Sequence, residues 1–212
     1  MTTVTLEEEF NPLNLLFTDY TSDDDYIIKE ILGIYKPDTW ELTPNNVLLE
    51  IGGHIGEISM TCAKKYGCKV VVYEPSPKNY AKLTKNIELN GLTDLIETHQ
   101  IAISSKIGET VFYEDTRNTG FSGLGYRESA EEIIVEVTTL KYAIEQIRMK
   151  GGFIQVLLMD CEGSEFEILR DLTPLFGIAK FRGEFHSTQE ENEELLAKIR
   201  MVIPDSKIIF AK

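Results

Sequence analysis

Short apolar runs alternate with amphipathic segments along most of the chain. The apolar runs have the length of strands and few polar positions, which is typical of strands that a parallel sheet buries on both faces. The strands predicted in this way are Val47–Ile51, Lys69–Tyr73, Leu95–Ile103, Val156–Asp160, Ala179–Phe185 and Lys207–Phe210. The helices predicted between them lie at 56–65, 77–90, 164–170 and 190–200. This alternation predicts an α/β fold with a doubly wound, mainly parallel, Rossmann-like sheet.

One stretch departs from this alternation. Glu109–Tyr113 and Ile133–Thr138 both have the character of strands, and we predict no helix between them. We therefore expect an antiparallel strand pair inserted near 109–138. The segment between the two strands, 116–126, contains three glycines among polar and aromatic residues, so it is either a mobile loop that covers a ligand or a solvated hairpin tip.

The residues before the first buried strand form a region of their own. Apolar side chains at 26, 27, 31, 34 and 35 follow helical spacing, with Asp23–Asp25 as N-cap candidates and Pro37 as a stop. We expect residues 1–46 to be an N-terminal helical extension packed on the core. Residues 47–212 are expected to form one globular domain, since a chain of 212 residues can bury a sizeable core.

Composition and charge argue against several classes of protein. With 21 Lys+Arg against 35 Asp+Glu, the net charge of −14 argues against a nucleic-acid partner, since non-specific nucleic-acid binders rely on basic surfaces. The sequence contains no run of about 18 apolar residues, so we expect no transmembrane helix. The N-terminus has neither the basic start nor the apolar stretch of a signal peptide. Cys62, Cys68 and Cys161 lack metal-ligand spacing, so we expect reduced thiols in a cytoplasmic protein, with a Cys62–Cys68 disulfide as the alternative.

The candidate chemistry begins where the first buried strand ends. The segment Glu50-Ile51-Gly52-Gly53-His54-Ile55-Gly56 is a glycine-rich turn between a strand and a helix, where the backbone can approach a ligand closely. Glu74 ends the second strand, and a carboxylate at that position can accept hydrogen bonds from both hydroxyls of a ribose. His54 either bonds a carboxylate of the ligand or caps the next helix. Together these features predict a cofactor that contains a ribose.

Two details favour S-adenosylmethionine over NAD as that cofactor. The dinucleotide fingerprint requires glycine at position 51, where this chain has Ile51. Glu50 lies beside the turn, where its carboxylate would repel a pyrophosphate and attract a sulfonium or an ammonium group. An NAD-dependent oxidoreductase remains the alternative.

Six segments carry a resemblance to a known family when they are taken in order. They are LLEIGGHIG (48–56), VVYEPSPKNYAKLTKNIELNGL (71–92), AISSKIGETVFY (102–113), VEVTTL (135–140), MDCEGSEFEILRD (159–171) and GEFH (183–186). This set resembles the FkbM-type methyltransferases, a branch of the class I S-adenosylmethionine-dependent enzymes. The resemblance implies a class I methyltransferase fold with a terminal β-hairpin, of which Lys207–Phe210 would be a short or incomplete part.

The resemblance also implies roles for particular residues toward the methyl donor. Those that would line its methionine part are Glu50, Gly52, Gly53 and Gly56. Glu74 would bind the ribose with Pro75 beside it, and Gln100, Ile101 and Ala102 would border the adenine.

A second group of polar residues follows the fourth and fifth strands, and the resemblance assigns it to the family's acidic motif and final strand end. The group consists of Asp160, Glu162, Glu184 and His186. Because the carboxyl ends of parallel strands meet at one edge of a sheet, we expect this group to lie near the glycine-rich turn. An alcohol must lose a proton as it attacks a methyl group, so these residues are candidates for a general base or for the ligands of a divalent ion.

Other readings of these acidic residues stay open. Asp160 or Glu162 could instead cap the helix that follows. Glu165 and Glu167 are expected on the surface of that helix, and His99 is expected to be an ordinary strand residue.

We predict an S-adenosylmethionine-dependent methyltransferase that acts on a hydroxyl oxygen of a sugar or small metabolite. The acceptor rests mainly on the resemblance. In addition, the Asn/Asp-Pro-Pro-Tyr/Phe segment usual in enzymes that methylate base or amide nitrogens does not follow the fourth strand. Besides the oxidoreductase, the alternatives are a non-catalytic module that binds S-adenosylmethionine and a methyltransferase with a protein or peptide acceptor.

Overall fold

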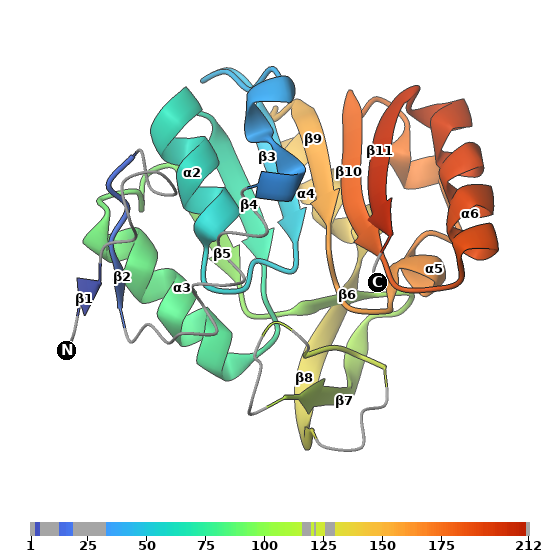
Figure 1. Cartoon of the computed structure of the whole chain (residues 1–212), viewed down its shortest axis with the longest axis horizontal. Helices are drawn as coiled ribbons and strands as arrows, with labels where there is room; N and C mark the ends of the chain where they lie inside the picture. The colour runs from blue at the N-terminus through green and yellow to red at the C-terminus, as the bar shows by residue number, and fades with distance from the viewer. Residues whose placement is uncertain are drawn as a thin grey trace.

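The computed structural model describes residues 3–4, 13–18, 33–115, 120, 122–125 and 130–210. The strands of its main sheet are β3 (Val47–Ile51), β4 (Lys69–Tyr73), β5 (Ile96–His99), β9 (Ile154–Met159), β10 (Lys180–Phe185) and β11 (Asp205–Phe210). They are all parallel and lie in the order β11-β10-β9-β3-β4-β5 (Figure 1). The doubly wound parallel sheet predicted from the sequence is therefore confirmed.

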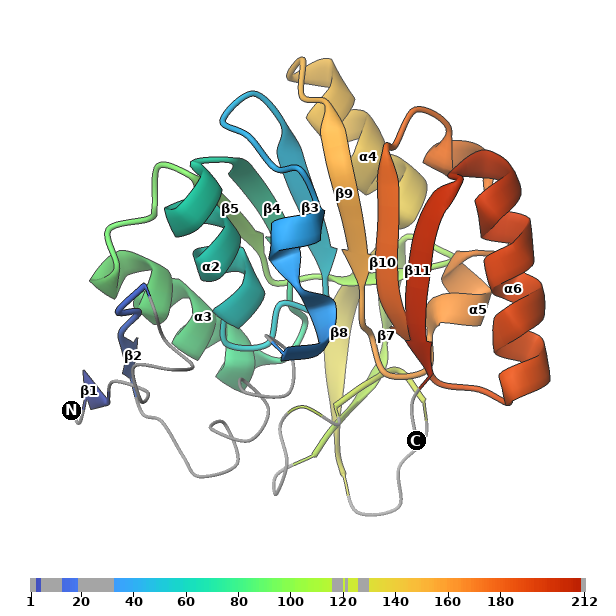
Figure 2. The same ribbon diagram turned by 45° about the horizontal axis from the view of Figure 1, so that its top comes forward.

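Helices cover both faces of this sheet. On one face, α2 (Glu57–Tyr66) and α3 (Pro77–Leu89) share a buried apolar cluster with Leu48. On the other, α4 (Leu140–Met149) and α6 (Gln189–Val202) share a second cluster with Leu49. The four-residue helix α5 (Glu165–Ile168) joins the second cluster through Ile168. Figure 2 shows the ribbon of α5 beside that of α6. Neighbouring strand residues thus point into opposite cores, which is why the strands read as apolar on both faces.

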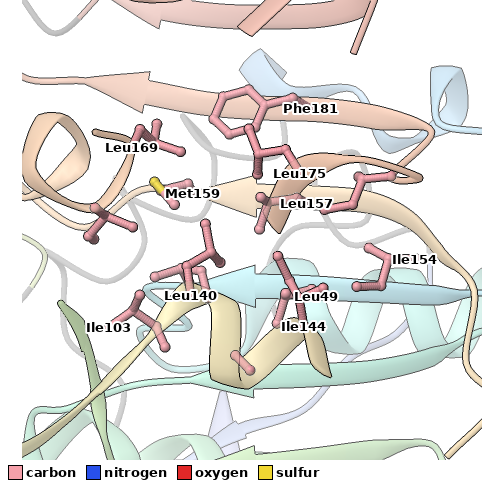
Figure 3. Close-up of a cluster of buried hydrophobic side chains, with 14 of the residues drawn as sticks. Leu49, Ile103, Leu140, Ile144, Ile154, Leu157, Met159, Leu169, Leu175 and Phe181 are labelled. Atoms are coloured by element: carbon pink, nitrogen blue, oxygen red, sulfur yellow. The ribbon is translucent and has the colours of Figure 1, made fainter. Parts of the chain in front are cut away.

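The helix α4 is absent from our sequence prediction. Its buried residues, Leu140, Ala143, Ile144 and Ile147, follow helical spacing, and the hydroxyl of Thr139 caps it by accepting the N–H of Tyr142. The strand β8 runs directly into this helix, so the apolar pattern changes period without an intervening loop. Figure 3 shows the result, with Leu140 and Ile144 beside Leu49 and the side chains of the neighbouring strands.

A second, smaller sheet contains the inserted strands. Its strands are β6 (Ala102–Ser104), β7 (Gly108–Glu114) and β8 (Glu131–Thr139), in the order β6-β8-β7. The strands β7 and β8 are antiparallel, as predicted. The single strand predicted at 95–103 is wrong, because the chain leaves the main sheet after His99 and enters the small sheet at Ala102. Figure 1 shows the small sheet projecting beyond the carboxyl edge of the main one.

The end of the chain also differs from the expectation. Instead of a terminal β-hairpin, β10 and β11 are parallel neighbours connected through α6. The connection is therefore another crossover unit, which extends the parallel sheet by one strand.

Parts of the N-terminal region pack on the core. Leu15, Phe17, Tyr35 and Trp40 are buried in the cluster that contains α2 and α3, and Trp40 is fully buried. Two short strands, β1 (Thr3–Val4) and β2 (Phe17–Thr18), form an antiparallel pair, and the 3₁₀ turn η1 (Pro37–Thr39) precedes Trp40. Most of the predicted helix lies outside the described residues. Of the part that the structure describes, residues 33–35 are helical.

The structure also bears on the predicted loop, on the cysteines and on the question of a membrane-spanning helix. Of the loop 116–126, only 120 and 122–125 lie within the described residues. Cys62 and Cys68 are buried free thiols. Across the ranges described, no helix has the length and apolarity that crossing a membrane requires.

The strand order reverses between β3 and β9, and the backbones come very close there. The N–H of Asp160 donates to the carbonyl oxygen of Ile51 over 2.9 Å. A Cβ atom at Gly52 would lie 1.8 Å from the carbonyl oxygen of Asp160, and the φ of Gly52 is +89°. Any side chain at Gly52 would therefore have to separate the two strands.

We expect Gly52→Ala to reduce the free energy of unfolding by at least about 2 kcal/mol more than Gly91→Ala, because overpacking adds to backbone strain. Gly91 is the matched control, since it also has a positive φ, +66°, but no atom of the described residues within 4 Å of its Cβ position. Urea unfolding of both variants measures the difference. Equal losses of stability would show that the contact between β3 and β9 does not constrain this position.

Candidate functional site

Acidic side chains gather where β3, β4, β9 and β10 end. Glu50, on β3, is 3% exposed, and its carboxylate accepts a hydrogen bond from the hydroxyl of Ser59. Burial raises the pKa of Glu50 well above its ordinary value, and the charges of Glu57, Asp160 and Glu74 raise it further. The main charges acting on this carboxyl are thus other carboxylates, which makes the region suited to a cation.

Glu74, at the end of β4, connects the glycine-rich turn after β3 with the loop after β4 through hydrogen bonds. One carboxylate oxygen accepts the backbone N–H of His54 and the other accepts that of Ser76, both over 2.9 Å. Glu74 is 5% exposed, and burial raises its pKa to about 7 although both hydrogen bonds act in the opposite direction. Each carboxylate oxygen has a second lone pair, so these bonds leave acceptor capacity for a ligand.

Close packing within the chain leaves no room for a side chain at two glycines of the turn. A Cβ atom at Gly53 would lie 2.2 Å from a methyl carbon of Val72, and one at Gly56 would lie 2.7 Å from a methyl carbon of Leu83. The ring of His54 lies 3.3 Å from Glu57, the first residue of α2. The turn is therefore held close to β4 and α3.

Glu57 brings a further acidic group to this turn. It is 3% exposed, and its second carboxylate oxygen, Oε2, has no hydrogen-bond partner among the residues that the structure describes. The sequence does not mark Glu57 as a site residue, because an acidic residue in the first turn of a helix is common wherever the helix lies.

The loop after Glu74 connects the site to the small sheet. Pro75 is half-buried, and the hydroxyl of Ser76 donates to Glu114 of β7 over 2.5 Å. Glu114 also forms an ion pair with Lys78. Strand β7 thereby supports the loop that carries Glu74.

The residues predicted to border an adenine lie between the two sheets. Gln100 is exposed, Ile101 is half-buried and Ala102 is buried at the start of β6. The N–H of Glu74 donates to the carbonyl oxygen of His99 over 3.0 Å, which brings this connection next to the end of β4. The ring of His99 stacks on Tyr73 with centroids 4.7 Å apart.

Asp160, after β9, is held by a residue from the N-terminal region. The hydroxyl of Tyr35 donates to one carboxylate oxygen of Asp160 over 3.1 Å. Burial, with the charges of Glu184 and Glu162, raises the pKa of Asp160 to about 8. The apolar spacing around Tyr35 indicates a helix face and gives no sign of this contact.

Glu165 organises the loop between β9 and α5. It is fully buried and accepts the N–H groups of Cys161 over 3.2 Å and of Gly163 over 3.1 Å. Its carboxylate also lies 3.1 Å from Nδ1 of His186. The expectation that Glu165 lies on the helix surface is therefore wrong, because the loop turns this side chain inward to satisfy its own N–H groups. Glu167, by contrast, is exposed, as expected.

His186 brings the end of β10 into the same group. Its Nε2 lies 3.5 Å from a carboxylate oxygen of Glu162. Burial alone would lower the pKa of His186, but Glu162 and Glu165 raise it to about 10. One ligand-type atom each from Asp160, Glu162 and His186 lies within 4.8 Å of the other two. The structure thus brings these residues together, while their roles remain predictions.

Three comparisons with known proteins bear on this site. The model of the methyltransferase FkbM domain matches residues 50–207. The methyltransferase sdnD of Sordaria araneosa is 25% identical over 174 residues, which cover 68% of this chain and 67% of that protein.

Among solved structures, TYW2 of P. horikoshii in complex with MeSAdo is similar with a TM-score of 0.35 and 16% identity, over 49% of this chain and 39% of that one. A SAM-dependent methyltransferase of Thiobacillus denitrificans in complex with S-adenosyl-L-homocysteine has a TM-score of 0.34 and 13% identity, over 50% and 40%. This chain thus spans less than half of the length of either solved chain. At these TM-scores, neither likeness indicates an activity.

We expect the ligand-free protein to lose stability as the pH rises from about 4.5 to about 7, because the folded protein holds a proton on Glu74 that the unfolded chain releases. Glu74 alone contributes at most about 3 kcal/mol over this window. Thermal unfolding midpoints of wild type and Glu74→Gln, measured across this pH range, test the prediction.

The Glu74→Gln profile should be flatter, while the hydrogen bond that it loses lowers the midpoint equally at every pH. Parallel profiles would show that Glu74 does not titrate in this window. Other buried carboxyl groups, such as Glu50, contribute to both profiles and cancel in the comparison.

Proposed function

Because the chain belongs to the methyltransferase FkbM domain family, we propose that it transfers the methyl group of S-adenosylmethionine to a hydroxyl oxygen of a sugar or small metabolite. One observation carries the proposal. Glu50, Glu74 and Asp160 follow one another at the carboxyl ends of three adjacent parallel strands, and their charges oppose each other. A sulfonium and an ammonium group would relieve this repulsion.

The donor would lie across the point where the strand order reverses, the usual place for ligands of open parallel sheets. We assign the ribose hydroxyls to Glu74 with Pro75 beside them. The methionine part would contact the turn formed by Glu50, Gly52, Gly53, His54 and Gly56. The connection Gln100, Ile101 and Ala102 would border the adenine.

Two alternatives fit the site less well: an NAD-dependent oxidoreductase and a non-catalytic module that binds S-adenosylmethionine. A pyrophosphate would raise the pKa of Glu50 further, whereas a bound cation would lower it, so NAD is the poorer fit. A module that only binds S-adenosylmethionine would have no need of a second polar group after β9 and β10. Asp160 and Glu162 at one strand end and His186 at the next therefore favour an enzyme.

The reaction is a displacement at carbon. The acceptor oxygen attacks the methyl carbon, the carbon–sulfur bond breaks, and its electron pair remains on the sulfur of S-adenosylhomocysteine. The hydroxyl proton must leave during this step, and Asp160, Glu162, Glu184 and His186 are the groups that we propose to manage it. Alignment of the acceptor within about 3–3.5 Å of the methyl carbon supplies most of the remaining acceleration.

A small-molecule or saccharide acceptor, a cytoplasmic location and the lack of a nucleic-acid partner belong to the same proposal. The acidic balance of the chain, −14, supports the last of these. A basic protein or peptide is the acceptor that the same charge would favour as an alternative.

We expect S-adenosylmethionine and S-adenosylhomocysteine, but not NAD, to raise the thermal unfolding midpoint. A ligand at about 100 times its dissociation constant stabilises the folded state by about 2.7 kcal/mol, which corresponds to about 5–10 °C for a chain of this size. A rise with NAD alone would contradict the charge argument.

Glu74→Ala should weaken donor binding by at least about 1.5 kcal/mol, because it removes charge-assisted hydrogen bonds to the ribose. Glu145→Ala is the matched control, since Glu145 is an exposed acidic residue on α4. Titration calorimetry with S-adenosylhomocysteine compares the two variants. Equal affinities would show that Glu74 does not bind the ribose.

We expect a ¹³C-labelled methyl group to appear on oxygen when labelled donor is incubated with the protein and a panel of sugars and hydroxylated metabolites. The carbon chemical shift separates O-methyl from N-methyl products, and the same assay with basic peptides tests the alternative. Label on peptide nitrogen, with none on any hydroxylated compound, would overturn the acceptor class.

A further inference from the structure

We propose that Asp160, Glu162 and His186 bind one divalent transition-metal cation, for which Mn²⁺ is the test ion. This inference deepens the proposed function, because it assigns the acceptor end of the site a means of activating a hydroxyl group. Metal binding itself can be measured without a methyl donor.

The geometry provides three ligands from two adjacent strand ends. One oxygen each of Asp160 and Glu162 and one ring nitrogen of His186 lie within 4.8 Å of one another, close enough to converge on a single ion. All three residues are partly exposed, so an ion can reach them and coordination positions remain for water or an acceptor. Two carboxylates and an imidazole form a mixed oxygen and nitrogen set of the kind that suits Mn²⁺ and related ions.

The partner of the second ring nitrogen fits this assignment. Nδ1 of His186 lies 3.1 Å from Glu165, while Nε2 faces Glu162 at 3.5 Å. Nδ1 can keep a proton that it donates to Glu165, while an ion between Nε2 and the carboxylates would take the place of the proton on Nε2. Metal-binding histidines usually have such a carboxylate on the far nitrogen, which fixes the ring and its tautomer.

The ligands are also held in place from outside the group. Glu165 is fixed by the N–H groups of Cys161 and Gly163, and the hydroxyl of Tyr35 holds one oxygen of Asp160. Glu165 and Tyr35 are thus positioning residues. Both come from places where the sequence shows no sign of a metal site.

A cation at this place would have a definite chemical use. It would coordinate the acceptor hydroxyl and lower its pKa, so that the oxygen attacks the methyl carbon as the proton leaves. The hydroxyl proton would pass to solvent water, which can reach these partly exposed groups.

The test is a titration of the full, donor-free chain with Mn²⁺, followed by the electron paramagnetic resonance signal of the free ion. We expect wild type to bind one Mn²⁺ per chain, and Glu162→Gln and His186→Gln each to weaken binding by at least about tenfold. The exposed control, Glu145→Gln, should bind as wild type does. Unfolding midpoints of all variants confirm that each is folded.

Glu165→Gln distinguishes positioning from a merely structural role. Its buried amide cannot accept all the hydrogen bonds of the carboxylate, so we expect weaker Mn²⁺ binding, while the affinity for S-adenosylhomocysteine stays as in wild type. If Glu165→Gln does not fold, the two ligand variants still decide the matter.

The proposal is overturned if wild type takes up no Mn²⁺ at millimolar concentration, or if Glu162→Gln and His186→Gln bind it as tightly as wild type. In either case, the three residues form only an ion-paired network. Failure of donor binding with intact Mn²⁺ binding would instead overturn the proposed methyl transfer and leave the metal site in place.

Discussion

Repulsion among buried and partly buried carboxylates at one edge of the parallel sheet is the constraint on which the candidate site depends. Each of these groups has a dedicated hydrogen-bond donor: Ser59 for Glu50, two backbone N–H groups for Glu74 and Tyr35 for Asp160. These donors do not remove the repulsion, because burial and neighbouring charges still raise the pKa of all three carboxyl groups. An edge built in this way is stabilised by positive charge, whether from a sulfonium ligand or from a metal ion.

The close approach of β3 and β9 brings the two halves of the site together. Gly52 leaves no room between its own backbone and the carbonyl of Asp160, so the glycine-rich turn and the acidic loop after β9 are in direct contact. Glu165 connects the strand ends of β9 and β10, since its carboxylate contacts both the loop after β9 and the imidazole of His186. The groups proposed for the two ends of the reaction are therefore fixed relative to each other before any ligand binds.

Two regions outside the main sheet complete this arrangement. Strand β7 supports the loop after Glu74 through Ser76 and Glu114, and the N-terminal region supplies Tyr35 to Asp160. Neither contact follows from local pattern, because the partners are 38 and 125 residues apart in the sequence. They make the site dependent on parts of the chain that would otherwise appear peripheral.

The sequence by itself determined the parallel sheet, the antiparallel insertion and the strand ends that carry Glu50, Glu74, Asp160 and His186, since apolar periodicity and turn residues are local signals. Only the tertiary structure decided where a strand divides between two sheets, as at Gln100, because that depends on which neighbours are available. It also decided that Glu165 is buried rather than exposed, since a helical position does not reveal which loop N–H groups lack an acceptor. Packing over long distances in the chain, which local pattern does not record, is the physical reason for both differences.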